Sequence, residues 1–459
     1  MGSSTVLGQV IGFVALAYVA RRVGPANLGD YNFAVSILAC FGVLNVGVGV
    51  LAIRDIAVDP DRRGAVATET TLLLVGLNGI SLVLVLLAAP LIAPSHQAAE
   101  LLRILAVTFL TSALLLEWGL MGLSRFRWVA VGRIAGQVAY GALVLLLLGR
   151  GHDGVVDYAV FNLAGYAVTS VIATGAYIAI GGFARPAAAG VGRLAQRLRR
   201  SVPVGFPLVV LQLYLYIDLI LLGYLGSARQ TGEYAVAGKL PYALTALGMV
   251  WGSVLYPHVA RIATSELAEL GRDLGRAVTF TLGGGALLLS GAAILARPVM
   301  TALFGQAYAG AASAFVVLSA AAVLLLADVT LGNALLARGH ERQYALAVAV
   351  GLAVNAVLDV VLIPIAGAVG PAAATLAVEA GIFAFFVTRV AGHVGRLPIA
   401  WSLVARAALA AAGAAALAAL LDPRPVAVRV IVFLAAVLAG VLLTGLARRS
   451  PWQAAWRAT

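Results

Sequence analysis

The sequence predicts an all-α polytopic membrane protein, on the evidence of its composition and of apolar segments that recur along its whole length. Hydrophobic residues make up 62% of the 459 residues, charged residues make up only 11%, and the mean hydropathy is +1.01. An ordinary soluble domain contains about 25% charged residues. Segments of about 20 apolar residues, each long enough for a helix to cross a hydrocarbon core roughly 30 Å thick, follow one another from end to end. These observations exclude a soluble protein.

The apolar segments predict twelve membrane spans, followed by two further spans that are rich in alanine. Arg406 lies inside the thirteenth segment, and a charged residue within a span is costly. We therefore expect between twelve and fourteen transmembrane helices. The predicted spans are residues 5–20, 31–53, 68–93, 101–122, 128–148, 155–180, 204–225, 233–257, 277–296, 311–336, 344–364, 371–390, 401–420 and 427–446.

The distribution of arginine predicts how these spans are oriented. If the N-terminus is cytoplasmic, 21 arginines lie in inner segments and 7 lie in outer segments. Short cytoplasmic loops are enriched in Lys and Arg, so this bias favours a cytoplasmic N-terminus. The frequent use of Ala, Gly and Arg fits a GC-rich bacterial genome. We therefore expect a multi-pass protein of the bacterial (inner) cell membrane.

Two stretches with the same pattern predict an internal repeat. The sequence "VGPANLGDYNFAVS" follows the first span, and "LGSARQTGEYAVAGKL" follows the seventh. In each stretch a glycine ends one helix, and a Gly-acid-Tyr triplet, at 29–31 and 232–234, opens the next. Glycine tolerates the positive φ of a helix end, an acid is favourable at a helix N-terminus, and tyrosine is favoured at a membrane interface.

Six spans separate the two motifs, so both halves have the same orientation and form parallel repeats. Two such lobes with a substrate between them are the architecture of an alternating-access transporter. The predicted organisation is an N-terminal six-helix lobe at 1–180, a basic cytoplasmic connector at 181–203, a C-terminal six-helix lobe at 204–396, and an extra C-terminal helix pair with a basic tail at 397–459.

The two motifs, together with "LNVGVGVLAIRDIA" and "IDLILLGYL", resemble the Wzx-type polysaccharide (oligosaccharide-lipid) flippases of the multidrug/oligosaccharidyl-lipid/polysaccharide exporter superfamily. The resemblance implies a central cavity lined by spans 1, 2, 7 and 8. It also implies that the chain flips undecaprenyl-diphosphate-linked oligosaccharide from the cytoplasmic to the outer leaflet, without ATP, for cell-surface polysaccharide biosynthesis. The alternatives in the same superfamily are a lipid II (peptidoglycan precursor) flippase and a cation-coupled multidrug exporter.

Two charged residues lie at the same depth in neighbouring predicted spans. Asp218 precedes the outer end of the seventh span, and Lys239 follows the outer start of the eighth. At 1.5 Å per residue, both lie roughly 10 Å below the outer surface. One interpretation is a structural ion pair. Another is a pair in the cavity, in which Lys239 meets the substrate diphosphate and Asp218 serves ion coupling or gating. A third is that both side chains extend to the interface.

Arginines at the ends of the cavity-lining spans are candidates for substrate binding. Arg22 lies at the outer end of the first span, and Arg54 and Arg261 lie at inner ends. A guanidinium group binds phosphate oxygens bidentately. We expect these three residues to contact the diphosphate, unless they serve only to fix the orientation of the spans.

Polar residues deeper in the spans complete the candidate set. Asn45 is expected in the cavity, where its amide bonds sugar hydroxyls, although a hydrogen bond between helices is the alternative. The same two roles are open to the other asparagines within spans, Asn78, Asn162, Asn333 and Asn355. Asp328 and Glu379 are the deepest acids of the second half, and we expect them to take part in ion coupling or gating, or else in helix packing. For Glu117 we expect a helix-packing hydrogen bond.

The same sequence excludes several classes of protein and partner. No P-loop pattern is present, and the longest extramembrane segment is the connector 181–203, which leaves no room for a nucleotide-binding or catalytic domain. We therefore expect neither an enzyme nor a nucleotide partner. No His/Cys spacing indicates a metal, no cofactor is expected, and the single Cys40 excludes an internal disulfide.

The expected partners follow from charge and from the resemblance. The net charge of +12 is explained by orientation in the membrane, so no nucleic acid partner is expected. The basic sequence "GRLAQRLRR" in the connector predicts an amphipathic helix on anionic lipids of the inner leaflet. The remaining expected partners are the lipid-linked oligosaccharide, a proton or sodium ion, and other polysaccharide-assembly proteins.

Overall fold

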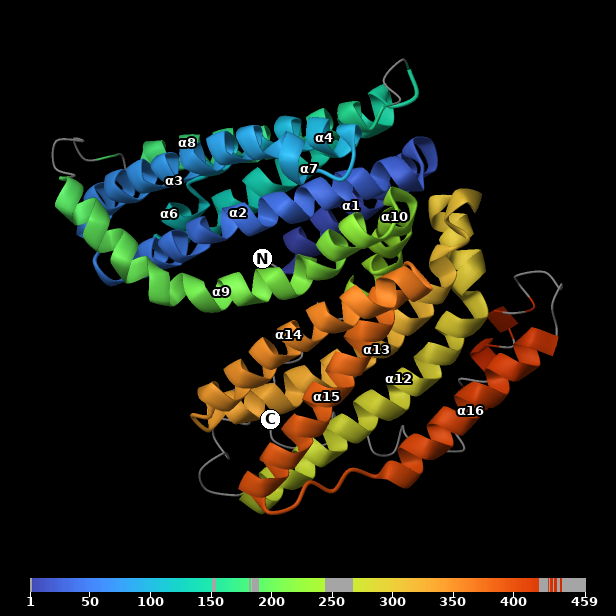
Figure 1. Cartoon of the computed structure of the whole chain (residues 1–459). Coiled ribbons are helices and arrows are strands. Elements are labelled where there is room, and N and C mark those ends of the chain that lie inside the picture. The colour runs from blue at the N-terminus through green and yellow to red at the C-terminus, as the bar shows by residue number, and fades with distance from the viewer. Residues whose placement is uncertain are drawn as a thin grey trace. The chain divides into compact units, whose positions relative to one another are not determined.

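The computed structural model describes residues 2–150, 154–180, 183, 190–243 and 267–420 and part of 428–439, and the regular structure in these residues is helical (Figure 1). The first part of the chain forms α1 (Gly2–Val23), α2 (Pro25–Val58), η1 (Pro60–Arg62), α3 (Arg63–Ile92), α4 (His96–Ala106), α5 (Thr108–Ala113), α6 (Glu117–Gly122), α7 (Phe126–Leu147) and α8 (Val155–Ile180). The second part forms α9 (Val191–Leu225), α10 (Ala228–Ala237), α12 (Leu267–Phe304), η3 (Gln306–Tyr308), α13 (Ala311–Ala337), α14 (Glu341–Ala366), α15 (Val369–Val394) and α16 (Trp401–Leu420).

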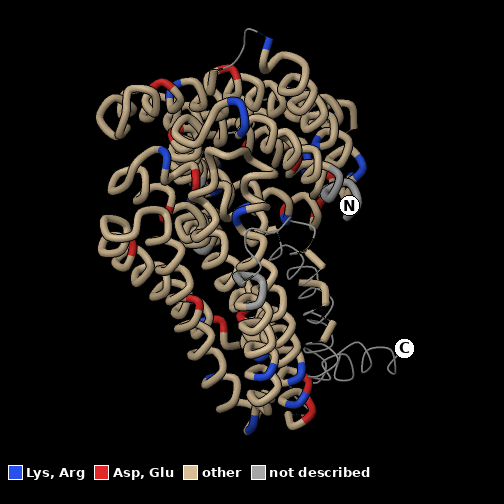
Figure 2. The backbone as a smooth tube through the Cα atoms, turned by 90° about the vertical axis from the view of Figure 1, so that its right-hand side faces the viewer, with Lys and Arg blue, Asp and Glu red and all other residues tan. Residues whose placement is uncertain are grey.

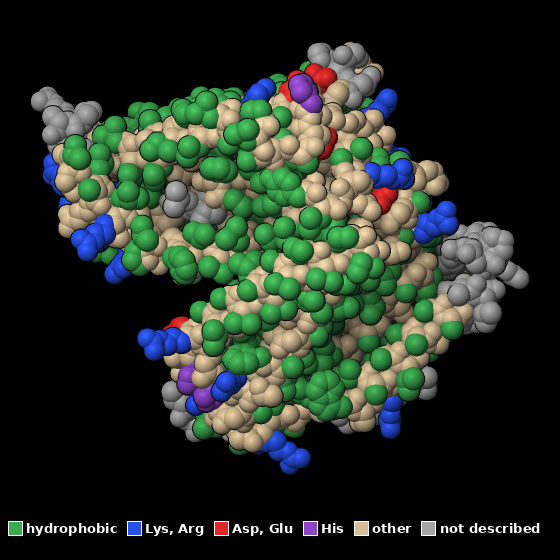
Figure 3. All heavy atoms as spheres, viewed as in Figure 1, with side chains coloured by type: hydrophobic (Ala, Val, Ile, Leu, Met, Phe, Trp, Pro, Cys, Tyr) green, Lys and Arg blue, Asp and Glu red, His purple; other side chains and the backbone are tan. Residues whose placement is uncertain are grey.

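Nine helical segments in the described part of the chain are long and apolar enough to cross a membrane. α2 makes a tenth, although it bends by 51° between Pro25–Gly42 and Asn45–Val58. Hydrophobic side chains cover the middle of the helices (Figure 3), and long stretches of the backbone carry few charges (Figure 2). These findings confirm a polytopic, all-helical membrane protein. Most of the eighth predicted span and of the fourteenth lies outside the described residues.

Contacts group the chain into two compact units, Met1–Gly232 and Glu233–Thr459. In the first unit α2 packs along the length of α9 and against α3, α4 and α6. In the second unit α13 packs against α12 and α15, and α12 also packs against α16. α9 thus belongs with the first unit, while the division into two repeated six-helix lobes stays a prediction.

α9 is longer than the span that was predicted for it. Its 35 residues, at 1.5 Å each, measure about 52 Å, which exceeds a hydrocarbon core of roughly 30 Å. The basic end of the connector is therefore the first part of α9 and continues directly into the seventh span. The basic segment is helical, as expected, but it is continuous with the seventh span and its Arg197 is buried. Its contact with anionic lipids stays a prediction.

The fourth predicted span is broken into α4, α5 and α6. The break frees the carbonyl groups of Thr111 and Leu114, which accept hydrogen bonds from side chains of α8. Ser170 donates to Thr111 over 2.8 Å, and Thr174 donates to Leu114. Since no lipid or water at this depth replaces a missing backbone hydrogen bond, these hydroxyl groups make the break possible.

The repeated motif starts its two helices at matching positions. α2 begins at Pro25 and α10 at Ala228, each six residues before the tyrosine of its motif. The triplets therefore lie in the second turn of each helix, and the prediction that they open the helix is wrong. Gly24 has φ 82°, which agrees with a glycine at the end of the preceding helix.

The acid of each triplet faces the N-terminus of another helix. Asp30 accepts a hydrogen bond from Ser95 (3.1 Å), and Ser95 in turn caps α4 by accepting from the Ala98 amide (2.9 Å). The carboxylate of Glu233 lies against Gly310, the residue that caps α13. Negative charge is favourable at these positions. In both halves the acid thus stabilises the start of the helix of the fourth span.

Candidate functional site

Two of the three predicted diphosphate-binding arginines lie on accessible surface. Arg22 and Arg54 are both exposed. The guanidinium group of Arg22 lies 5.5 Å from the ring centroid of Tyr18, which orients it at the end of α1. Arg261 lies outside the described residues. Both described arginines are therefore available to an anion, and their contact with a substrate stays a prediction.

Asn45 forms a hydrogen bond between two helices. Its Nδ2 donates to Oδ1 of Asn78 over 2.9 Å, and Nδ2 of Asn78 donates to the Leu74 carbonyl over 2.8 Å. Asn78 is buried, so the bond joins α2 to α3 inside the first unit. This is the alternative that the sequence allowed for Asn45, and it leaves the sugar-binding role as a prediction.

Asp218 and Lys239 lie in different units. Asp218 is buried in α9 of the first unit, with 6% of its surface exposed. Lys239 is an exposed residue of the second unit, just after α10. Their pairing, and with it a role in the cavity, stays a prediction.

Asp328 and Glu379 lie next to each other inside the second unit. They come from α13 and α15, and their exposed fractions are 4% and 2%. The two carboxyl groups interact directly, and Tyr344 of α14 lies close enough to interact with both. Neither oxygen of Asp328 accepts a hydrogen bond from an amide, hydroxyl or basic group of the described residues. The structure thus brings the two sequence-predicted coupling residues together.

The two neighbouring carboxyl groups belong to different helices, α13 and α15. Two charged carboxylates repel each other in an apolar interior, and a hydrogen bond between two carboxyl groups requires a proton on one of them. A role of this pair in ion coupling or gating stays a prediction.

A buried arginine that the sequence analysis did not single out joins three helices at one end of the first unit. Arg197 of α9 has only 7% of its surface exposed, and it pairs with Asp55 of α2 (3.2 Å) and Glu69 of α3 (3.3 Å). Arg193 and Arg200 flank it and lie 3.7 Å from the same two acids. Part of this network lines a cavity of about 400 Å³, together with Arg54.

A signal for this network was present in the sequence. Arg193, Arg197 and Arg200 recur at spacings of four and three residues, which puts them on one face of a helix. Arginines on one face that meet buried acids indicate an ion-pair network rather than a lipid contact. This pattern was overlooked because the predicted orientation of the spans in the membrane already explained why arginines gather in the connector.

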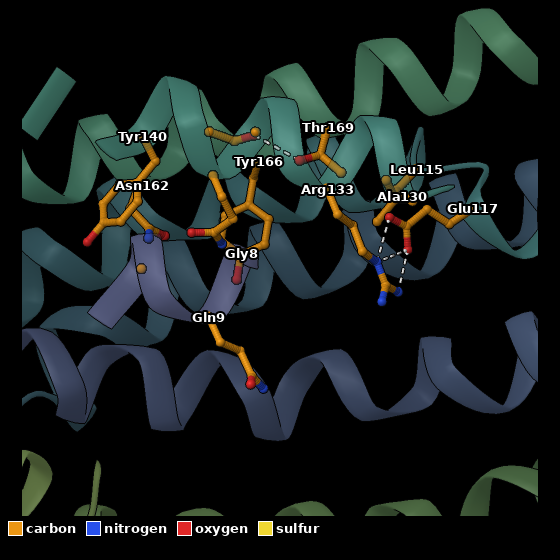
Figure 4. Close-up of a pocket in the computed structure, with 14 residues that line it drawn as sticks. Gly8, Gln9, Leu115, Glu117, Ala130, Arg133, Tyr140, Asn162, Tyr166 and Thr169 are labelled. Atoms are coloured by element: carbon orange, nitrogen blue, oxygen red, sulfur yellow. Dashed lines mark hydrogen bonds and ion pairs between the residues drawn. The ribbon is translucent and has the colours of Figure 1, made fainter. Parts of the chain in front are cut away.

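A second ion pair lines a pocket in the first unit. Glu117, at the start of α6, accepts hydrogen bonds from Nε (3.0 Å) and Nη2 (2.8 Å) of Arg133 in α7 (Figure 4). The predicted helix-packing bond of Glu117 is thus a bidentate ion pair, which Arg133 completes from the neighbouring helix. The pocket beside it has a volume of about 470 Å³.

Comparisons with known proteins agree on the class of the chain. The polysaccharide biosynthesis protein family matches residues 1–263. A comparison with curated protein sequences found no match. Among solved structures, the lipid II flippase MurJ in an inward closed conformation is 14% identical, with a TM-score of 0.75 over 96% of this chain and 98% of that one.

Two further solved structures have the same fold. An inward-facing multidrug resistance MATE family transporter of the MOP superfamily is 17% identical, with a TM-score of 0.66 over 84% of this chain and 95% of that one. A MOP superfamily transporter from Pyrococcus furiosus is 16% identical, with a TM-score of 0.51 over 85% and 94%. The family match over more than half of the sequence shows that the chain belongs to the polysaccharide biosynthesis protein family.

Proposed function

We propose that this protein flips a lipid-linked oligosaccharide, carried on undecaprenyl diphosphate, from the cytoplasmic to the outer leaflet for cell-surface polysaccharide biosynthesis. The observation that carries the proposal is the family match over residues 1–263, on a helical fold that is similar to a lipid II flippase over 96% of the chain. The protein works by alternating access without ATP. It resides in a bacterial inner membrane with its N-terminus in the cytoplasm.

The geometry supports this assignment through its charges. The exposed Arg22 and Arg54 suit contacts with a diphosphate, because guanidinium groups bind phosphate oxygens bidentately. The buried Asp328–Glu379 pair suits coupling to a proton gradient, and moving one charge through the membrane potential is worth about 2.3 kcal/mol per 100 mV. In the described part of the chain, this acid pair favours ion coupling as the energy source for transport.

A lipid II flippase is the second candidate. It is favoured by the TM-score of 0.75 to MurJ and by the nearly complete coverage of both chains. Lipid II is also a diphosphate-linked saccharide on a polyprenyl carrier, so the arginines and the acid pair serve either substrate. The family match to polysaccharide biosynthesis proteins favours the first candidate.

Deletion of the gene from its bacterium tests the proposal. Surface glycan is expected to disappear while the lipid-linked oligosaccharide accumulates on the cytoplasmic leaflet, and a plasmid copy is expected to reverse both effects. Normal surface glycan in the deletion strain contradicts the proposal. Accumulation of lipid II with intact surface glycan would establish the second candidate, and hypersensitivity to drugs alone would indicate a multidrug exporter.

A further inference from the structure

Several polar side chains line the pocket beside the Glu117–Arg133 ion pair, although it lies within predicted membrane spans. It opens between α1, α6, α7 and α8 of the first unit and has a volume of about 470 Å³. This volume falls in the range of about 300–1,000 Å³ that is typical of small-ligand sites. Of the residues that the sequence offered for substrate binding, Asn162 alone lines it. The function of the pocket therefore needs its own explanation.

Amide and phenol groups dominate the lining that faces α1. Figure 4 shows Tyr140 of α7 and Asn162 and Tyr166 of α8 extending toward α1. The ring of Tyr166 has 55% of its surface exposed, and Gln137 is also exposed. Polar side chains that are exposed at membrane depth face water or a ligand rather than hydrocarbon. We therefore expect water or a ligand in this pocket.

Glycines make the room for these side chains. Gly8 and Gly12 of α1 lie one turn apart, and a Cβ at either position would meet the Gln137 side chain, at 3.6 Å and 3.1 Å. Gly136 and Gly165 bring α7 and α8 into backbone contact at the wall of the pocket. The small residues let the amide of Gln137 lie across α1, and they keep the space beside it open.

The ion pair supplies a fixed donor at one end of the pocket. Nε and Nη2 of Arg133 are held by Glu117, so the two N–H groups on Nη1 are not used by that carboxylate. The arginine side chain is 54% exposed, whereas that of Glu117 is 11% exposed. The guanidinium group is thus held in place by a buried acid and is available to a ligand.

The combination of groups selects a class of ligand. Amides both donate and accept hydrogen bonds, which matches the paired hydroxyl groups of a sugar, and phenol rings offer an apolar face with a polar edge. An apolar drug would be expected to select a lining dominated by hydrophobic side chains. A phosphate would match Arg133 and the amide N–H groups, but it has no donor for the amide carbonyl oxygens.

We propose that this pocket binds sugar units of the lipid-linked oligosaccharide, through Gln137, Asn162 and the Arg133–Glu117 pair. This inference rests on the function proposed above and adds to it a site for the glycan that is separate from the arginines expected to meet the diphosphate. Recognition of the glycan is then carried by the first unit alone.

Single cysteines test the proposal in cells. Cys40 is the only cysteine, so Cys40→Ala gives a cysteine-free chain into which Gln137→Cys or Asn162→Cys is introduced. Labelling by N-ethylmaleimide is compared between cells that make the lipid-linked oligosaccharide and cells that lack the first glycosyltransferase of its synthesis. Labelling at both positions is expected to be slower when the oligosaccharide is present. A cysteine at Val191, which is 83% exposed at the start of α9, serves as control and is expected to label equally in both strains.

Equal labelling at positions 137 and 162 in the two strains overturns the proposal. The absence of labelling at both positions in both strains overturns it as well, because the pocket is then closed to water. A second measurement uses Gln137→Leu combined with Asn162→Leu, which is expected to lower surface glycan about tenfold at an unchanged amount of protein, since two hydrogen bonds to the substrate are lost. Gln306→Leu, a matched change at an exposed residue of η3, is expected to have no effect.

The two proposals fail in different ways. If the wild-type chain restores surface glycan to the deletion strain and the double variant does so equally well, only the pocket assignment is wrong. If the deletion strain has normal surface glycan, the proposed function is wrong. The labelling of position 137 then no longer depends on the oligosaccharide.

Discussion

Gly29 and Gly232, the matching glycines of the two repeated motifs, lie against each other in the first unit. A Cβ on Gly29 would overlap the Ala228 carbonyl, and a Cβ on Gly232 would overlap the Pro25 carbonyl, so the contact is reciprocal. Ala228 follows Pro25 at the same distance along the chain as Gly232 follows Gly29. The contact is therefore a local two-fold relationship between the two turns. It explains why both turns carry glycine at this position, because a helix crossing this close leaves no room for a side chain.

Substitution of either glycine by alanine is expected to destabilise the protein. Forcing a methyl group into a closely packed contact costs about 1–3 kcal/mol. The melting temperature of purified Gly29→Ala and Gly232→Ala is therefore expected to fall below that of the wild type in a fluorescence melting experiment.

Gly76 and Gly79 of α3 provide matched controls, because a Cβ at either position meets nothing within 4 Å. Gly76→Ala and Gly79→Ala are expected to keep or raise the melting temperature, since alanine restricts the unfolded chain. Wild-type stability of Gly29→Ala would show that α2 and α10 do not cross as closely as described.

Removal of Arg197 is expected to destabilise the first unit strongly. Breaking a buried ion pair by removing one partner costs about 3–5 kcal/mol, because the other charges stay buried without compensation. Arg197→Gln leaves both Asp55 and Glu69 without their main partner. Thermal melting in detergent is expected to show a clear loss of stability.

The neighbouring exposed Arg199 offers a control for the loss of one positive charge. Arg199→Gln is expected to melt like the wild type. The triple variant Arg197→Gln with Asp55→Asn and Glu69→Gln is expected to regain part of the lost stability, because it removes the uncompensated charges. Equal melting of Arg197→Gln and Arg199→Gln would disprove the buried network.

Asp328→Asn is expected to make transport independent of the proton gradient. The amide of asparagine still donates a hydrogen bond to Glu379, so the variant is expected to fold. The amide takes up no proton, so the proposed exchange of a proton at this pair is lost. Flipping of a fluorescent lipid-linked saccharide in proteoliposomes, with and without an imposed pH gradient, measures the effect.

Asp61→Asn, at an exposed residue of η1, is expected to keep the response to the gradient. If transport by Asp328→Asn responds to the proton gradient like the wild type, the acid pair serves only helix packing. Glu379→Gln is expected to behave like Asp328→Asn, because either substitution leaves a single carboxyl group at the pair.

Charge exchange distinguishes the three interpretations of Asp218 and Lys239. If the pair acts in the cavity, both single variants and the double variant Asp218→Lys with Lys239→Asp are expected to lose surface glycan by roughly tenfold or more, as expected when a charge-assisted interaction is removed. If the pair is only structural, the double variant regains activity that the single variants lack. Normal activity of all three variants would indicate that both side chains extend to the interface.

Much of the fold follows from the sequence because hydropathy alone marks a membrane-spanning helix. The predicted spans that lie in the described residues coincide with helical segments. Helix ends were less accurate, since Pro25 and Ala228 start their helices well before the apolar segments begin. The break at 114–116 carried no local signal, because Leu114, Leu115 and Leu116 read as a continuous apolar helix and the hydroxyl groups that support the break lie on α8.

The candidate sites, too, were predictable from the sequence only in part. The acids Asp328 and Glu379 were found from their depth in the spans, because a charge in hydrocarbon is unusual in itself. Their contact was not predictable, since nothing in the sequence says which faces of α13 and α15 meet. Arg197 was interpreted only as a sign of membrane orientation. The pocket beside Glu117 and Arg133 was not predicted as a site. Its amides and phenols are unremarkable one at a time, and they form a site only when the helices bring them together.

The long contact between α2 and α9 has a mechanical consequence. The two helices are fastened at one end by Arg197 and Asp55, in the middle by Gly205 against Gly47, and at the other end by Gly223 against Phe33. The pair is thus fastened at three places along about 50 Å, on both sides of the 51° bend of α2. The first unit ends at Gly232, only a few residues after α9 ends at Leu225. The repeated glycine motif that follows the α2–α9 pair is therefore also the place where the chain leaves the first unit.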